Sequence, residues 1–253
     1  MDITPGTFTP APQRASVTDM VAAQGKIESK LMLRHGEQLL LNLVIPAAIL
    51  LGSVFAPFFG EEATLNDIVP MVFSVAAASA GFTGQAIALA FDRRYGALKR
   101  TGASGVPAWT IIAGKIIAVF ATVLIQIIVL GGLSLILGWS VSFLGVVLGL
   151  CTLFIGVTAF ASLGLLMGGT LSSEVVLACA NLIWLVLFAV LGWVVYSGHL
   201  GDPGFWDLVP SVALASAMNG AVQGSVNATA CLSLIAWAAV SVFGASRWFR
   251  FEG

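Results

Sequence analysis

The chain has 253 residues, 58% of them hydrophobic and only 9% charged, with a formal net charge of -1. Soluble domains carry about a quarter charged residues, so this composition excludes a water-soluble protein and predicts one that spans a lipid membrane. The net charge says little, because in a membrane protein the position of each charge matters more than the sum, and we expect no nucleic-acid partner.

Residues 1–17 are predicted to form a flexible tail. They are mostly polar and contain Pro5, Pro10 and Pro12, without the basic and then apolar order of a signal peptide. The rest of the chain, residues 18–253, is predicted to form a single membrane domain.

An amphipathic helix is predicted over Thr18–Gln38, ahead of the first apolar run. One helical face carries apolar side chains and the neighbouring face carries cations; these are Met20, Ile27 and Leu31, and then Lys26, Lys30 and Arg34. Such a helix is expected to lie in the membrane interface. The alternative is an ordinary extension of the first span into the cytoplasm.

Six apolar runs have the length of about 20 residues that a membrane-spanning helix needs. They predict an all-α membrane protein with a tight hairpin between the third and fourth spans, at Trp139 and Ser140. The predicted spans are Leu39–Phe59, Ile68–Phe91, Trp109–Leu137, Phe143–Gly168, Val175–Tyr196 and Val226–Ala245.

The charges outside these runs predict the orientation of the spans. With the N-terminus inside, all eleven Lys and Arg residues fall on the cytoplasmic side. The segments on the other side then carry only acids, namely Glu61, Glu62, Asp67, Asp202 and Asp207. The positive-inside rule therefore predicts cytoplasmic N- and C-termini in the plasma (inner) membrane, and it makes residues 92–107 a cytoplasmic loop.

The last outer segment, Ser197–Ser225, is rich in glycine and proline before it becomes mildly apolar over Ser211–Ala221. This apolar part is too short to cross a bilayer. We expect it to form a short re-entrant or surface helix before the sixth span.

No residue pattern predicts an enzyme or a metal site. The three cysteines lie in apolar runs without metal-site spacing, and His35 and His199 fall on opposite sides of the membrane. Gly102–Gly105 reads GASG, as in rhomboid-type intramembrane proteases, but the only histidine after Ser104 is His199, which is across the bilayer. The chain also lacks a P-loop, so we do not expect it to hydrolyse ATP by itself.

The polar residues within the predicted spans are uncharged at mid-membrane. Asn42, Gln85, Gln126 and Asn181 could line a substrate path, or they could bond between helices, which is the commoner case. Lys115 lies near the inner end of its span, from where it could snorkel to the interface. A channel or ion-coupled transporter usually needs a buried acid or base, so the sequence favours neither.

Charged and small residues form an ordered pattern along the chain. Gly114–Ile116 opens the third span, Leu171–Glu174 precedes Asn181 in the fifth, and Pro210 precedes the sixth. The loop after the second span has a charged pair, a glycine, an apolar residue, a basic residue and a proline: Asp92, Arg93, Arg94, Gly96, Leu98, Lys99, Arg100 and Pro107. From about Thr18 onward, this set resembles ABC-2-type transporter permeases of the daunorubicin-resistance-permease kind. The outer loop YSGHLGDP at Tyr196–Pro203 departs from the family's Gly-aromatic-Pro turn.

The resemblance implies that residues 18–253 are an ABC-2-type transmembrane domain, the permease subunit of an ATP-driven ABC exporter. The substrate would be hydrophobic or amphipathic, such as a drug, lipid or glycolipid, and would move by alternating access at a permease dimer interface. ATP and Mg would be bound by separate ATPase subunits, with no cofactor or metal on this chain. The alternatives are a secondary transporter or channel, and a non-transporting membrane scaffold subunit.

The resemblance also assigns roles to residues. The loop 92–107 would be the coupling loop that docks on the ATPase, through Arg93, Arg94, Gly96, Leu98, Lys99 and Arg100. A second docking contact is expected at Lys26, Lys30 and Arg34. The substrate path, along spans two and five, is expected to include Phe82, Gln85 and Asn181.

Overall fold

The computed structural model describes residues 15–34, 36–56, 58–60, 62–103, 105–202 and 204–248. Most of the predicted tail, residues 1–14, lies outside this part of the chain, as do His35, Glu61 and Ser104. Within the described residues all regular structure is helical, which confirms the all-α fold class.

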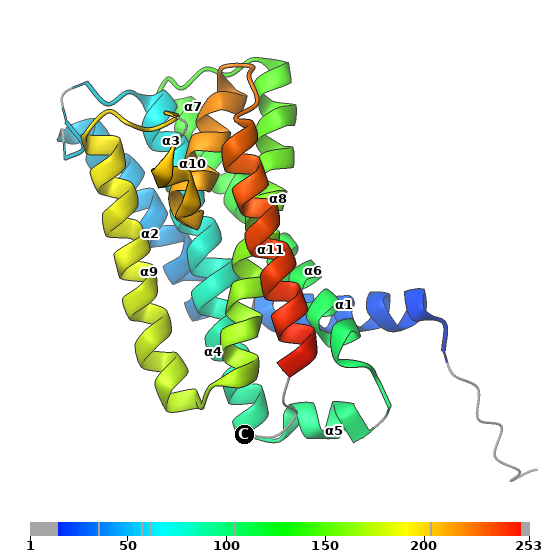
Figure 1. Ribbon diagram of the computed structural model, residues 1–253. Helices are drawn as coiled ribbons and strands as arrows, with labels where there is room; N and C mark the ends of the chain where they lie inside the picture. Colours follow the sequence, from blue (N-terminus) through cyan, green and yellow to red (C-terminus); the bar gives the residue numbers. More distant parts are fainter. Residues whose placement is uncertain are drawn as a thin grey trace, which may run out of the picture.

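Long helices form a bundle, to which shorter helices are attached (Figure 1). Two of the long rods contain a π-helical segment: the first consists of α3 (Leu65–Ala77), η1 (Ala78–Thr83) and α4 (Gly84–Arg94), and the second of α6 (Ala108–Gln126), η2 (Ile127–Gly131) and α7 (Gly132–Ile136). The other long helices are α2 (Gly36–Phe55), α8 (Phe143–Thr170), α9 (Ser173–Tyr196) and α11 (Ala228–Trp248). The remaining elements are α1 (Val17–Arg34), α5 (Ala97–Ala103), the 3-10 turn η3 (Phe205–Leu208) and α10 (Pro210–Val222).

Five rods in the described residues are long and apolar enough to cross a membrane. They match the second to sixth predicted spans and are Leu65–Arg94, Trp109–Ile136, Phe143–Thr170, Ser173–Tyr196 and Ala228–Trp248. The first predicted span, Leu39–Phe59, corresponds to α2, whose described apolar part covers only Asn42–Phe55. The chain is therefore a multi-pass membrane protein, and a crossing by α2 stays a prediction.

α1 lies across the long helices, in the half of the bundle that ends in α5 (Figure 1). It packs on α6 through glycines on both helices: a Cβ at Gly25 would lie 3.0 Å from Ile117, and one at Gly114 would lie 2.4 Å from Gln24. Because α1 runs crosswise, it does not continue α2 into the cytoplasm, and that alternative is wrong. A position in the membrane interface stays a prediction.

α8 packs against the α3–α4 rod by an approach that only glycine permits. A Cβ at Gly164 would lie 2.4 Å from the Phe82 carbonyl oxygen, and one at Gly168 would lie 2.4 Å from the Ala86 carbonyl oxygen. Small residues at a spacing of four let helices approach closely in lipid, where tight packing replaces the hydrophobic effect as the cause of association. The two glycines therefore set the distance between the central helices.

α10 is inserted into the bundle instead of lying on its surface. It begins with Pro210, which suits the first turn of a helix, and nearly all its residues are buried against α3, α8, α9 and α11. The Ser211 hydroxyl donates to the Leu187 carbonyl at 2.9 Å, and the Ser74 hydroxyl donates to the Ser211 carbonyl at 2.7 Å. Of the two expectations for this segment, the surface helix is thus wrong.

Alanine at Gly164 is expected to destabilise the protein by about 1–3 kcal/mol, because the new Cβ forces α8 and the α3–α4 rod apart. Gly149→Ala is the matched control in the same helix, since no atom of another described element lies within 4 Å of the Cβ it adds. Thermal unfolding in detergent should show a lower Tm for Gly164→Ala and an unchanged or raised Tm for Gly149→Ala. Equal Tm values for the two variants would contradict the packing described here.

Candidate functional site

The turn between α4 and α5 depends on Gly96. This residue has φ +70, and its amide donates to the Arg93 carbonyl at 3.0 Å. A glycine in the left-handed region after the end of a helix is a common way to terminate it, because a side chain would be strained there. The turn lets α5 start at Ala97 and lie across the end of the bundle (Figure 1).

α5 has one buried and one exposed side. Leu98 is only 3% exposed and belongs to an apolar cluster with Leu89, Ile111 and Ala245, from α4, α6 and α11. Lys99 and Arg100 are exposed. The short helix is therefore held to the bundle by an apolar contact and presents two cations outward.

The two arginines at the end of α4 bind the connection between α8 and α9. Arg93 is 5% exposed, and its Nη1 donates to the carbonyls of Gly168 at 2.9 Å and Leu171 at 2.8 Å, where α8 ends. A cation there satisfies carbonyls that have no partner within the helix. Arg94 pairs with Glu174 at 2.6 Å, on the first turn of α9.

The six residues expected to dock on an ATPase thus fall into different environments. Lys99 and Arg100 face outward, Arg94 is partly exposed in its ion pair, and Gly96 shapes the turn. Arg93 and Leu98 are buried inside this chain, so here they hold the loop in place instead of presenting a surface to a partner. The second expected set, Lys26, Lys30 and Arg34, is exposed on α1.

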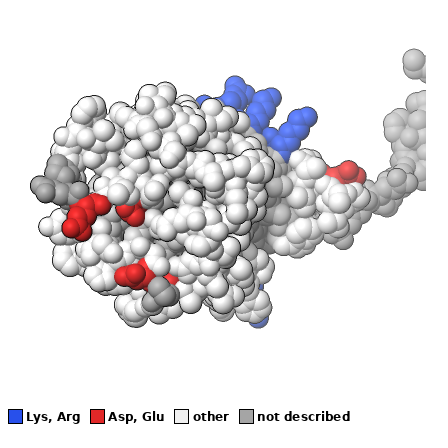
Figure 2. Space-filling model, turned by 90° about the horizontal axis from the view of Figure 1, so that it is seen from above, with Lys and Arg blue, Asp and Glu red and all other residues white. Residues whose placement is uncertain are grey.

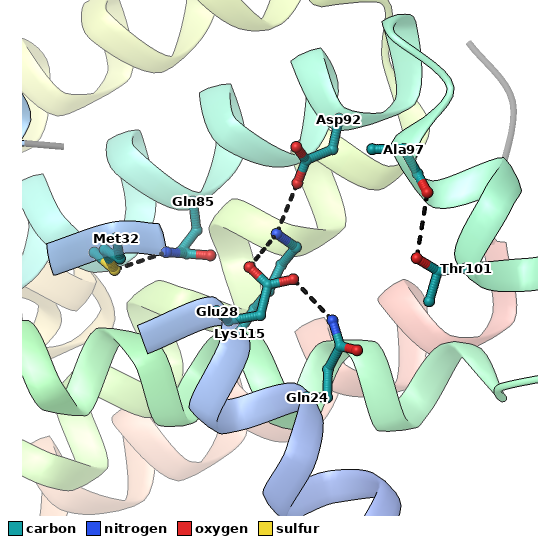
Figure 3. Close-up of polar contacts among 8 residues, drawn as sticks. All are labelled: Gln24, Glu28, Met32, Gln85, Asp92, Ala97, Thr101 and Lys115. Carbon is teal, nitrogen blue, oxygen red and sulfur yellow. Dashed lines mark hydrogen bonds and ion pairs between the residues drawn. The ribbon is translucent and has the colours of Figure 1, made fainter. Parts of the chain in front are cut away.

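A buried ion group joins α1, α4 and α6 (Figure 3). Lys115 is 2% exposed, and its Nζ lies 2.9 Å from Glu28 Oε2 and 2.8 Å from Asp92 Oδ2. The other oxygen of Glu28 accepts from Gln24 Nε2 at 2.9 Å. The expectation that Lys115 snorkels to the interface is therefore wrong: its ammonium is enclosed and bonded to two carboxylates.

Little in the sequence indicates this ion group. Glu28 and Asp92 are 87 and 23 positions from Lys115, so no local spacing connects the three. The available signal was one acid among the cations of α1 and one acid in the basic loop. In the folded chain, α1 packs against α6, and both acids then have Lys115 as their partner.

The three residues expected to line a substrate path have different surroundings. Phe82 is buried, whereas Asn181 lies on the exposed side of α9 and donates to the Leu177 carbonyl of its own helix at 2.8 Å. Gln85 is buried on the side of α4 that faces α1, and its Nε2 contacts Met32 Sδ at 3.5 Å.

Two other amides considered for the path bond between helices. Gln126 Nε2 on α6 donates to the carbonyls of Asn42 at 3.2 Å and Ala76 at 3.3 Å. Asn42 Oδ1 on α2 accepts from the Ser79 hydroxyl of η1 at 2.8 Å. These contacts connect α2, the α3–α4 rod and α6 within the bundle, which is the commoner role for amides in lipid.

The opposite end of the bundle has a different charge. Glu62 and Asp202 are exposed in the connections there, and Asp67 lies at the start of α3, where it bonds Thr64 and Asn219. Figure 2 shows acidic side chains over this face, with basic side chains only at its margin. The two ends of the bundle thus differ in charge as the sequence pattern predicts.

Replacing Lys115 by Met should destabilise the protein by about 3 kcal/mol, because two partly buried carboxylates lose their partner. The triple variant Glu28→Gln, Asp92→Asn, Lys115→Met should recover much of the lost Tm, since uncharged partners avoid that cost. Lys26→Met, at an exposed position of α1, is the control. Thermal unfolding in detergent measures all three, and a Lys115→Met variant as stable as the control would contradict the ion group.

A sequence model of the family described as ABC-2 type transporter matches residues 22–226. Comparison with curated proteins and with solved structures gave no match. The matched region runs from α1 to the residues just before α11, and so contains the ion group, the α4–α5 turn, α5 and α10. The chain therefore belongs to the ABC-2 type transporter family, as a transmembrane permease.

Proposed function

We propose that this chain is the permease subunit of an ATP-driven ABC exporter, which moves a hydrophobic or amphipathic substrate out across the plasma (inner) membrane. The observation that supports this proposal best is α5, a short helix held to the bundle by Leu98 and exposing Lys99 and Arg100. Cations on such a surface can pair with acids on a separate ATPase subunit. ATP and Mg would be bound by that subunit.

The contacts of α5 suit it to transmit a displacement. It connects α4 and α6, which are parts of two long rods. Arg93, three residues before Gly96, is bonded to the end of α8, and Lys115 on α6 is bonded to α1. A push on α5 would therefore act on four helices together, which is what coupling ATP hydrolysis to a change of access requires.

A second permease, identical or a paralogue, is proposed to complete the transport path. Among the candidate spans in the described residues, α9 is the least buried: 17% of its most apolar stretch is buried, against 72% for Leu65–Arg94. Its exposed side carries Asn181, and an amide facing lipid is unfavourable. A partner permease against α9 would cover this side, and the substrate would pass along the dimer interface near spans two and five.

The orientation and the path residues belong to the same proposal. The α5 end is proposed to be cytoplasmic, with both termini inside, α1 in the inner interface, and α2 as the first of six spans. Lys26, Lys30 and Arg34 are proposed as a second contact with the ATPase. Phe82, Gln85 and Asn181 are proposed to contribute to the substrate path.

Charge reversal of Lys99 and Arg100 to Glu should abolish recovery of the ATPase, because the exposed cations of α5 then repel its acids. The measurement is a mild-detergent pull-down of the tagged chain from its native membrane, with the co-purifying chains identified by mass spectrometry. The wild-type chain should bring down a P-loop ATPase in stoichiometric amount.

Arg247→Glu is the matched control, because Arg247 is another exposed cation, on the last turn of α11. It should leave the recovery unchanged. A stable wild-type complex without any ATPase would favour the channel, secondary transporter or scaffold alternatives. Full recovery with the α5 variant would mean that its cations only hold the membrane topology.

The proposed orientation is tested by cysteine labelling in a variant without Cys151, Cys179 and Cys231. A cysteine in place of Asp202, which is exposed in the α9–α10 connection, should react with a membrane-impermeant maleimide in intact cells, because this connection would be outside. A cysteine at Lys99 should react only after the membrane is opened. The reverse pattern of labelling would overturn the orientation.

A further inference from the structure

A cavity lies beside the buried ion group, between α1, α4 and α6. Its volume is about 290 Å³, at the lower end of the range of ligand pockets. Its lining combines the ion group with an amide and several apolar side chains. The lining includes Glu28, Asp92, Lys115, Gln85, Leu31 and Ala88. Leu31 and Ala88 are exposed, so the cavity opens on the outside of the bundle.

The charge in this cavity is negative. Among its lining residues in the described part of the chain, the charged ones are two carboxylates and one ammonium. Lys115 already contacts both carboxylates, at 2.9 Å and 2.8 Å, whereas the Asp92 side chain is still 39% exposed. A second cation would therefore be attracted to the site. An anion would be repelled by the net negative charge, because the ammonium of Lys115 is already paired with the two carboxylates.

An unpartnered acceptor points to an occupant. Gln85 is 4% exposed, and its Oε1 has no hydrogen-bond partner among the described residues, although a buried polar atom usually has one. Figure 3 shows this oxygen turned away from Met32, toward the side on which Lys115 and Asp92 lie. An N–H donor in the cavity would satisfy it.

We propose that this cavity binds the ammonium group of a cationic amphiphile, with Asp92 and Glu28 supplying the negative charge and the Gln85 oxygen accepting an N–H bond. The apolar tail lies along Leu31 and Ala88, toward the surface between α1 and α4. The ammonium group can belong to a small amphiphile or to the ethanolamine headgroup of a lipid. The proposal deepens the proposed function, on which it rests, by giving the amphipathic substrate a positive charge.

The test uses the full chain in dodecyl maltoside micelles, which contain no ammonium group. The probe is dodecylammonium with a photoreactive diazirine on its chain, and dodecanol with the same diazirine is the neutral comparison. Dodecylammonium should label peptides of α1 and α4 that contain Leu31 or Ala88. Unlabelled decylammonium should compete with the probe, and decanol and decyl phosphate should not.

Four variants distinguish recognition of the charge from general adhesion of the tail. Glu28→Gln, Asp92→Asn and Gln85→Leu should each weaken the apparent affinity for dodecylammonium by about tenfold, because each removes a charge or a hydrogen bond to a charged group. Ala88→Phe narrows the opening of the cavity without changing the ion group, and it should reduce labelling as well. This variant keeps the test valid if a change in the ion group perturbs folding. Glu174→Gln is the matched control, since it removes another ion-paired carboxylate at the same end of the bundle, outside the cavity.

Each outcome has a definite meaning. Equal labelling by the dodecanol probe, competition by decyl phosphate, or unchanged affinity in all four cavity variants would overturn the proposal. Loss of labelling on adding phosphatidylethanolamine would support it and identify a lipid as the source of the ammonium, whereas competition by decylammonium alone would support a small amphiphile. Binding is measured without an ATPase, so a negative result here leaves the α5 docking test intact, and failure of that test leaves this one intact.

Discussion

The arrangement of the α5 end depends on one buried lysine. Lys115 reaches Glu28 on α1 and Asp92 on α4 from its position on α6, and it has almost no contact with solvent. Withdrawing the Lys115 ammonium from water is costly, and it is tolerated only where the charge finds close partners in suitable geometry. The crosswise position of α1, the separation of α4 and α6, and the cavity between them are therefore fixed together.

The other cations of this region divide into internal and external ones. Arg93 binds the carbonyls at the end of α8, and Arg94 pairs with Glu174 at the beginning of α9, so α4 is connected to the neighbouring hairpin on its other side. The exposed ion pair between Arg94 and Glu174 can contribute little to stability, since solvent screens it. Its role is geometric, because it holds the α8–α9 connection beside the α4–α5 turn. Lys99 and Arg100 remain on the outer face of α5, where a partner can reach them.

Close packing between helices and hydrogen bonds between helices occur near the same segment of this fold, η1. Gly164 and Gly168 bring α8 against the carbonyls of the α3–α4 rod, and the rod itself contains the π-helical segment η1 at that level. π-helical turns within α-helices often mark functional sites, because they interrupt the regular hydrogen bonds. Here Gln126 donates to the Ala76 carbonyl just before η1, and Ser79 within it bonds Asn42. A displacement of α5 would reach this polar centre through continuous helices instead of loops.

The sequence by itself determined the membrane class, the limits of the long rods to within a few residues, the short helix before the last rod and the opposite charges of the two ends. These properties follow from local composition: apolar length defines a span, and lysine and arginine mark one side. Only the tertiary structure decided that Arg93 and Leu98 point inward, that α10 is buried, and that Lys115 is held by Glu28 and Asp92. Such pairings join residues far apart in the chain, and an isolated cation looks the same in the sequence whether it faces water, a partner or a buried carboxylate.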